Sequence, residues 1–173
     1  MKPGLNRRTQ RNRKKNLIPL SKLRAAEVVR TVVDHPRRLD ELVNLLQDKD
    51  RAIRGRAAAT LARLSESHPG RLIRHLESLR EALGDDAAFV RWHVVYVIGQ
   101  VIACCPLRAS FVLSDVSARM TDEDRLVRRF ACRALEHVAR LKPQLIDALY
   151  SANREAMPTE VARILRGADP GEL

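Results

Sequence analysis

Residues 122–135 read DEDRLVRRFACRAL, and two earlier stretches match them position for position. Residues 85–98 read DDAAFVRWHVVYVI, and residues 48–61 read DKDRAIRGRAAATL. The three stretches begin 37 residues apart, each with an aspartate, and each has an apolar residue and then an arginine at its sixth and seventh positions. A fixed period of this length is typical of repeat arrays, in which each unit buries its apolar face only against its neighbours. The sequence therefore predicts a stack of repeated units.

Apolar residues recur in each unit as two stripes with helical spacing. Members of a stripe are three or four residues apart, which places them on one side of a helix. The first stripe comprises Leu39, Leu42 and Leu46, then Leu76, Leu79 and Leu83, then Leu113, Val116 and Met120. The second comprises Ile53, Ala57, Leu61 and Leu64, then Val90, Val94, Ile98 and Val101, then Val127, Ala131, Leu135 and Val138. Each unit is therefore predicted to be a hairpin of two antiparallel helices.

Prolines mark where the first helix of a unit begins. Pro69, Pro106 and Pro143 are 37 residues apart, and proline suits the first helical turn because that turn needs no N–H donor. Pro36 comes four residues late against this period. We therefore expect the first helix of unit one to be about one turn shorter than its equivalents.

The two ends of the array are expected to differ from its middle. Ser21 is predicted to cap an N-terminal helix that runs to about Val33. A degraded fourth unit follows residue 143, as expected of a terminal repeat that covers the open end of the core. Its first helix would carry Leu145, Ile146 and Leu149, and a short last helix would carry Val161, Ile164 and Leu165.

The charge of the chain is uneven. The formal net charge is +11, yet residues 1–24 hold nine lysines and arginines and no acid, which leaves the rest nearly neutral. Residues 1–16 offer no apolar face and their like charges repel one another, so we predict a basic, disordered arm there. Its charged members are Arg7, Arg8, Arg11, Arg13, Lys14 and Lys15.

Composition indicates an aliphatic core and argues against several protein classes. Hydrophobic residues make up 45% of the 173 positions, but aromatic residues only 3%. No apolar run reaches the roughly 18 residues of a transmembrane helix, and no signal-peptide pattern follows the basic N-terminus. The cysteines are Cys104, Cys105 and Cys132, which do not form the pattern of a disulfide framework. We therefore expect a reducing compartment, the cytoplasm.

With these features in register, residues 48–61, 85–98 and 122–135 resemble HEAT repeats, which are armadillo-like helical hairpins. The resemblance rests on the aspartate, the apolar residue followed by arginine, and the small residues that precede the next large aliphatic one. It implies an all-α, right-handed α-solenoid of about four hairpins with an N-terminal capping helix. This domain would cover residues 17–166, with a frayed terminus at 167–173.

The recurring aspartates and arginines have a structural interpretation in this resemblance. Each aspartate is predicted to lie where a second helix starts, where it can accept hydrogen bonds from free N–H groups and meet the positive end of the helix dipole. The arginines are implied to form a ladder of charge-assisted hydrogen bonds between adjacent turns. The ladder would comprise Asp48, Asp85, Asp122, Arg54, Arg91 and Arg128.

In HEAT-like arrays the second helices line the concave side, so their outward positions are candidates for binding. Residues four apart in the third unit follow one line of the helix, and positions one and two units earlier would lie beside them. Gly55, Trp92 and Arg129 would share one outward position. The candidate partner-binding residues are Arg63, Trp92, Tyr96, Gln100, Arg125, Arg129, Arg133 and His137.

The favoured function is a non-catalytic interaction or scaffold module that binds a macromolecular partner, most simply a protein, on the concave face. The alternative is a nucleic-acid-binding protein. Arginine forks phosphates and aromatic rings stack on bases, and the basic arm would add affinity through counterion release. Such an arm also suits acidic proteins, ribosomal RNA or anionic lipid.

An enzymatic function is the least favoured reading. Bacterial alkylpurine DNA glycosylases are built of HEAT-like repeats with aromatic residues and a carboxylate in the groove, and Trp92 and Tyr96 would match the aromatic part. Catalysis would need a positioned carboxylate, and the nearest acid to the predicted groove is Glu136, at its edge. The histidines and cysteines lack the spacing of a zinc site, and no phosphate-binding loop is present. We therefore predict no catalytic residue, metal or cofactor.

Overall fold

The computed structural model describes residues 18–141 and 143–152, and every element in that part of the chain is helical. The predicted basic arm at 1–16, the last helix predicted over Val161, Ile164 and Leu165, and the predicted frayed end at 167–173 lie outside the described residues. No helix in the described part is long and apolar enough to cross a membrane.

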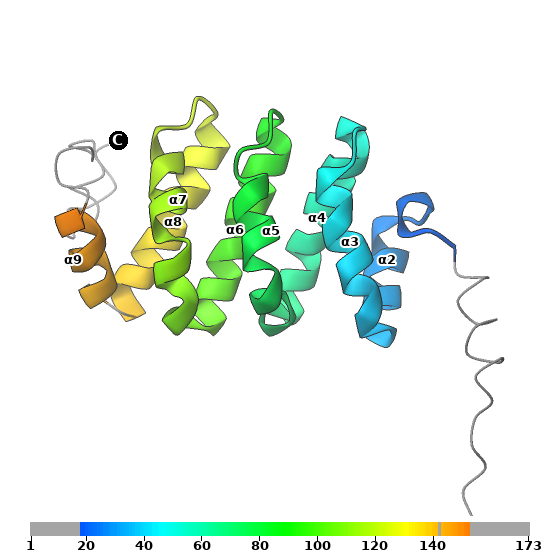
Figure 1. Ribbon diagram of the computed structural model, residues 1–173, viewed down its shortest axis with the longest axis horizontal. Helices are drawn as coiled ribbons and strands as arrows, with labels where there is room; N and C mark the ends of the chain where they lie inside the picture. Colours follow the sequence, from blue (N-terminus) through cyan, green and yellow to red (C-terminus); the bar gives the residue numbers. More distant parts are fainter. Residues whose placement is uncertain (1–17, 142, 153–173) are drawn as a thin grey trace, which may run out of the picture.

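Helical hairpins follow one another along the described chain (Figure 1). The first unit comprises η2 (Pro36–Arg38), α3 (Leu39–Asn44), η3 (Leu45–Gln47) and α4 (Arg51–Ser67). The second comprises η4 (Pro69–His75), α5 (Leu76–Ala82) and α6 (Ala88–Cys104). The third comprises η5 (Pro106–Phe111), α7 (Leu113–Ala118), η6 (Arg119–Thr121) and α8 (Arg125–Leu141). They are preceded by η1 (Leu20–Lys22) and α2 (Ala25–Asp34) and followed by α9 (Pro143–Ala152).

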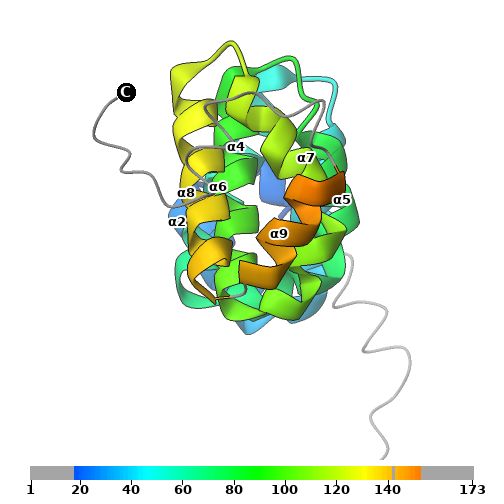
Figure 2. The ribbon, with the colours of Figure 1, turned by 90° about the vertical axis from the view of Figure 1, so that its left-hand side faces the viewer.

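The helices form two layers (Figures 1 and 2). One layer contains α2, α4, α6 and α8, which pack side by side in that order. The other contains α3, α5, α7 and α9. The second helix of each hairpin is therefore flanked by its equivalents in the neighbouring units, which brings positions 37 residues apart close together.

The core lies between the two layers and follows the predicted stripes. Every member of the first stripe is buried, and so is every member of the second stripe except Ile53, which is half-buried. Helix α6 is also buried on its flanks, where Val95, Val97 and Ile102 are in the core. The aliphatic composition is therefore sufficient to fill the stack without large rings inside it.

The prolines open helices as predicted, although the first turns in the three complete units are 3-10 rather than α. Pro36, Pro69 and Pro106 begin η2, η4 and η5, and Pro143 begins α9. Bonds between residues three apart close these turns, such as the bond that the Arg71 N–H donates to the His68 carbonyl at 3.1 Å. The helical part before the acidic turn is shorter in unit one than in unit two, in line with the late proline.

The predicted start of the N-terminal helix is wrong. Ser21 lies in η1, and α2 begins at Ala25. The Leu20 N–H donates to the Glu41 carboxylate at 3.0 Å, which holds η1 against α3 and separates it from α2. The helix start is closed by Glu27, whose carboxylate accepts from the Arg24 N–H at 2.9 Å. The apolar side of α2, which includes Val28 and Val32, is buried.

Candidate interaction surface on the second helices

The arginine at the start of each second helix binds the turn of its own unit. The Nη1 atom of Arg54 donates to the Asp48 carbonyl at 3.0 Å, and that of Arg91 donates to the Asp85 carbonyl at 2.9 Å. Arg128 does the same with the Asp122 carbonyl at 2.7 Å. These carbonyls belong to the bend before the helix, where the backbone offers them no hydrogen-bond donor. The guanidinium groups supply that donor.

The same arginines reach the aspartate of the following unit. Arg54 Nε donates to the Asp85 carboxylate at 2.6 Å. Arg91 Nε and Nη2 donate to the two oxygens of Asp122 at 2.9 and 2.8 Å. Position 159, one period after Asp122, is a threonine outside the described residues. Two ladder contacts thus connect units one to two and two to three.

The aspartates also organise the turns that lead into the second helices. Asp48, Asp85 and Asp122 each accept from the N–H two residues later, at 2.8, 2.8 and 3.0 Å. Capping inside the helix falls to different residues: Asp50 accepts from the Ala52 N–H and Asp124 from the Leu126 N–H, both at 2.8 Å. Helix α6 has Ala87 at this place and no side-chain cap. The acidic turns are therefore equivalent in shape but not in capping.

The ladder changes the protonation behaviour of its members. Burial acts to raise the pKa of the Asp122 carboxyl, but hydrogen bonds from Arg91 and the Asp124 N–H outweigh it, so the pKa lies below its usual value. Asp85 follows the same pattern with Arg54 and the Ala87 N–H. Hydrogen bonds to these carboxylates raise the guanidinium pKa of Arg54 and Arg91 in turn.

The solvent-facing side of α4, α6 and α8 is here called the second-helix face. Arg140 of α8 lies 4.0 Å from Glu136. The other exposed arginines of this face lie on α4 and α8 and form no ion pair with any acid in the described part of the chain. They are Arg51, Arg56, Arg63, Arg125, Arg129 and Arg133. The acids of these three helices are Glu66 and Glu136, so the face carries a large excess of positive charge.

An aromatic cluster lies between the two rows of arginines. It consists of Phe89, Trp92, His93, Tyr96 and Phe130. The Trp92 ring stacks on Phe130 from the next unit, with centroids 5.3 Å apart and planes at 15°, and on His93 at 3.4 Å. Tyr96 meets Phe130 edge to face at 5.5 Å. Trp92 and Tyr96 are accordingly half-buried rather than free outward groups.

His93 is the buried member of this cluster. Its Nδ1 lies 2.7 Å from the Phe89 carbonyl oxygen, which can only accept, so Nδ1 carries the proton. Burial lowers the pKa of His93, an effect that this hydrogen bond partly offsets. The residue is thus a neutral, structural member of the cluster at pH 7.

Several predicted binding residues meet in a hollow between α6 and α8. Tyr96, Gln100, Arg133 and His137 line this cavity of about 220 Å³ together with Phe130. The Tyr96 hydroxyl donates to the Glu66 carboxylate at 3.5 Å, and burial, together with Glu66, raises its pKa. Arg125 and Arg129 are exposed on α8 but do not line the hollow, and Arg63 lines a separate pocket beside α2.

The expectation that the position shared by Gly55, Trp92 and Arg129 faces outward in every unit is wrong for Gly55. Gly55 is buried because the Phe89 ring of the next unit covers it, and a Cβ at position 55 would lie 3.2 Å from that ring. Phe89 and Phe130 were not among the predicted site residues. The sequence does contain an indication of their role, because both are large rings close to the predicted outward positions. The other units have alanine and leucine at the position of Phe89, and arginine and histidine at that of Phe130.

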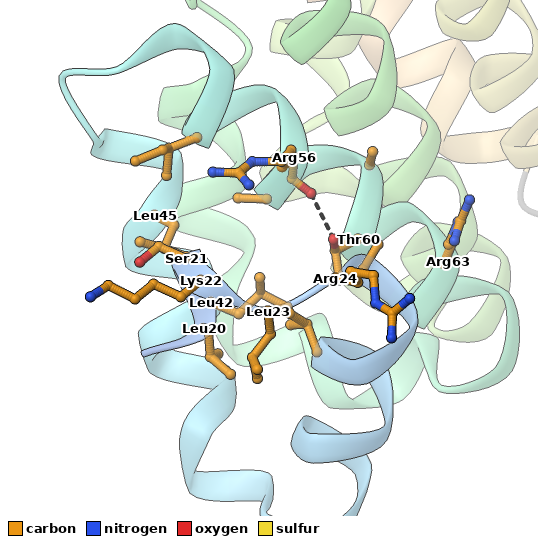
Figure 3. Close-up of a pocket in the computed structure, with 15 residues that line it drawn as sticks. Leu20, Ser21, Lys22, Leu23, Arg24, Leu42, Leu45, Arg56, Thr60 and Arg63 are labelled. Carbon is orange, nitrogen blue, oxygen red and sulfur yellow. Dashed lines mark hydrogen bonds between the residues drawn. The ribbon is translucent and has the colours of Figure 1, made fainter. Parts of the chain in front are cut away.

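Two further pockets flank the N-terminal part of α4. The α2–α4 pocket, of about 390 Å³, lies between η1, α2 and α4 (Figure 3). The α4–α6 pocket, of about 570 Å³, lies between the first half of α4 and the start of α6, and Phe89 is one of its lining residues. Neither was predicted from the sequence, because each is formed by residues of two neighbouring units. Among the described residues no cluster of histidine, cysteine, aspartate or glutamate could hold a metal ion.

No protein-family model matches the sequence, and no curated protein matches it. Solved structures share its fold. An engineered protein of 19% identity has a TM-score of 0.61 over 95% of this chain and 73% of its own. Computationally designed armadillo repeat proteins for modular peptide recognition have a TM-score of 0.62 at 20% identity, over 92% of this chain and 75% of theirs. A designed armadillo repeat protein in complex with peptide (KR)4 has a TM-score of 0.60 at 18% identity, over 94% and 76%.

The chain has the fold of an armadillo/HEAT-like α-solenoid. The solenoid predicted from the 37-residue period is thereby confirmed. In this solenoid the helices α3, α5 and α7 form one layer, and α4, α6 and α8 form the layer that carries the arginines and the aromatic cluster.

Proposed function

We propose that this solenoid is a non-catalytic interaction module that binds a segment of a partner protein on the second-helix face. The observation that carries the proposal is the unbalanced charge of that face, where the exposed arginines on α4 and α8 other than Arg140 have no acidic partner among the described residues. Like charges that lie along one surface repel one another, and a ligand with carboxylates relieves that repulsion. The partner segment is therefore acidic.

The aromatic cluster supplies the apolar part of the same surface. Half-buried Trp92, Tyr96 and Phe130 are held in place by their contacts with one another. Aromatic side chains and arginines are the residue types that contribute most to protein–protein binding, since they combine a large apolar area with fixed polar groups. A partner segment that crosses α6 would contact both types.

The structural neighbours support a peptide ligand. The designed armadillo repeat proteins of similar fold were made for modular peptide recognition, and one is in complex with peptide (KR)4. That peptide is basic. The second-helix face of this chain is itself basic, so electrostatic complementarity favours a ligand of opposite sign here.

Nucleic acid is the second candidate, favoured by the exposed arginines and by the basic arm predicted at residues 1–16. Arginines bind phosphates, and an arm of this kind adds counterion-release affinity. Base stacking needs an accessible ring face. Trp92 and Phe130 stack on each other, which withdraws the surfaces in that contact from any base. This arrangement favours the protein segment.

The proposal is tested by selecting displayed peptides on the immobilised full-length chain. Random peptides of about 12 residues span about 40 Å when extended, enough to cross several second helices. We expect enrichment of acidic peptides with apolar residues. In fluorescence anisotropy, the double variant Arg129→Glu/Arg133→Glu should bind them about tenfold more weakly, whereas Arg30→Glu, an exposed arginine on α2, should change binding by less than about twofold.

The competing function gives a different result in the same assay. Labelled duplex DNA and single-stranded RNA are titrated between about 50 and 200 mM salt. Tight, salt-dependent binding of either nucleic acid, with no peptide enriched, would overturn the protein-segment proposal. If Arg129→Glu/Arg133→Glu leaves the affinity for the selected peptides unchanged, the arginines of α8 are not part of the binding surface.

A further inference from the structure

The α2–α4 pocket combines an apolar floor with a basic rim. Leu23, Val28 and Leu42 contribute to the floor. The rim carries Arg24 at the start of α2 and Arg56 and Arg63 on α4 (Figure 3). No acidic side chain lines the pocket among the described residues. Arg24 is paired with Glu27 at 2.9 Å, whereas Arg56 and Arg63 have no acidic partner in the described part of the chain.

The α4–α6 pocket lies on the other side of the same helix. Its apolar walls include Ala52, Val90 and the half-exposed ring of Phe89, and that ring packs so closely over Gly55 that a Cβ there would lie 3.2 Å from it. Arg51 and Arg56 contribute positive charge. Asp50 also lines the pocket, but its carboxylate already accepts from the Ala52 N–H as the cap of α4.

Two residues of α4 line both pockets. They are Arg56, which is exposed, and Ala59, which is half-buried. The pockets are therefore adjacent, with one arginine above the ridge between them and a small side chain on that ridge. An extended chain that crosses α4 can place one side chain on each side of the ridge while its polar groups meet Arg56.

We propose that these two pockets form one binding site for an extended acidic segment of a partner protein that carries two apolar anchors. The pockets lie on opposite sides of one helix, a separation of about 10 Å, which an extended chain covers in about three residues. The anchors therefore stand about three residues apart, and the residues between and beside them carry carboxylates that bind Arg56 and Arg63. This inference rests on the proposed function and assigns it a second site, at the α2 end of the second-helix face.

Charge separates this occupant from the other segments that could cover the pockets. The rim is basic, so the second-helix face of another copy of this chain would bring further arginines against Arg56 and Arg63. The arm at residues 2–15 carries the same sign and would be repelled as well. Nucleic acid would match the charge, but its phosphates and sugars gain nothing from the apolar floors. An acidic segment with apolar anchors uses both properties.

The test uses the full-length chain and the peptides selected on it. Ala59→Trp places a large ring where the two pockets adjoin and so obstructs both of them. Arg56→Glu reverses the charge of the arginine that lines both pockets. Each is expected to weaken binding about tenfold or more. The matched controls are Ala26→Trp and Arg30→Glu, two exposed positions on α2 that line neither pocket, and each should change binding by less than about twofold. Circular dichroism melting verifies that Ala59→Trp folds, and exposed Arg56→Glu gives an independent readout.

Peptide variants and further probes complete the experiment. Serine in place of either apolar anchor should weaken binding about tenfold. Peptides that are insensitive to Ala59→Trp and Arg56→Glu but sensitive to Arg129→Glu/Arg133→Glu would overturn this site and leave the proposed function in place. Failure to select any peptide would overturn both. If the protein self-associates in sedimentation and Ala59→Trp abolishes the association, the pockets bind a second copy of the chain instead. If the protein binds labelled DNA and only Arg56→Glu weakens this binding, the basic rim binds nucleic acid.

Discussion

The Arg91 guanidinium holds both carboxylate oxygens of Asp122 across the boundary between the second and third units. The two side chains are only 7% and 3% exposed. Asp122 also accepts from Arg119 at 3.3 Å. The carboxylate is therefore anchored from both layers of the solenoid, and its principal partner is a residue 31 positions earlier in the chain.

Removing Arg91 should destabilise the protein strongly. The variant Arg91→Leu leaves a buried carboxylate without its main partner, a change that costs about 3–5 kcal/mol in other proteins. Urea unfolding measures the loss. The control is Arg80→Ala, which removes partly exposed pairs with Glu77 at 2.6 Å and with Asp115 at 4.0 Å and should cost less than about 1 kcal/mol. Equal losses for the two variants would contradict a structural role for the ladder.

The stability of the solenoid should depend on pH through His93. Burial lowers the pKa of His93 below its usual 6.5. The unfolded chain therefore binds a proton as the pH falls through about 6.5, and the folded chain does not, so the free energy of unfolding decreases below that pH. Burial and Arg74 lower the pKa of His75 too, which adds to the slope. The variant His93→Gln should flatten the stability curve between about pH 5 and 7 in urea titrations. An unchanged slope would contradict the buried, neutral assignment.

Trp92 gives a direct optical test of the aromatic cluster, because it is the only tryptophan in the chain. Phe130→Ala removes the ring on which Trp92 stacks and should expose the indole to water. The expected result is a red-shifted emission maximum and stronger quenching by acrylamide. Phe111→Ala, an exposed phenylalanine on η5, serves as the control and should leave the spectrum unchanged. A spectrum unaffected by Phe130→Ala would place Trp92 elsewhere.

Core positions predicted by the period should be costly to truncate. Ile98 and Leu135 are completely buried, so Ile98→Ala and Leu135→Ala should each lower the free energy of unfolding by about 2–5 kcal/mol. Ser114→Ala, at an exposed position of α7, should change it by less than about 0.5 kcal/mol. Chemical denaturation of the three variants makes the comparison, and a small loss at Ile98 would show that the register of α6 is shifted.

The fold was predictable because hydrophobic spacing and the period depend on the same physical requirement. Each hairpin must bury one stripe against the next, so Leu61, Ile98 and Leu135 fall in equivalent buried places whatever surrounds them. The start of α2 was mispredicted for the opposite reason. A contact from Glu41, far along the chain, holds η1 in a separate turn, and no local pattern around Ser21 indicates it.

The candidate site was predictable only where equivalent residues have similar size. Tyr96 and Arg133 lie in one hollow, as the alignment of units implied. At the neighbouring position the units carry Gly55, Trp92 and Arg129, and the large rings of Phe89 and Phe130 cross the unit boundaries to fill the difference. Such contacts depend on the shapes of side chains from two units at once. An alignment of the repeats shows which positions are equivalent but not how their side chains pack.

The ladder gives the stack a direction. Arg54 and Arg91 each use a carboxylate that only the following unit supplies, so an internal unit is completed by its C-terminal neighbour. A second copy of residues 69–105 inserted after position 105 would restore every such contact, because its own aspartate would receive the first Arg91 and its own arginine would reach Asp122. The array is thus extensible from within, and a lengthened chain would present an additional segment of second-helix surface to a longer ligand.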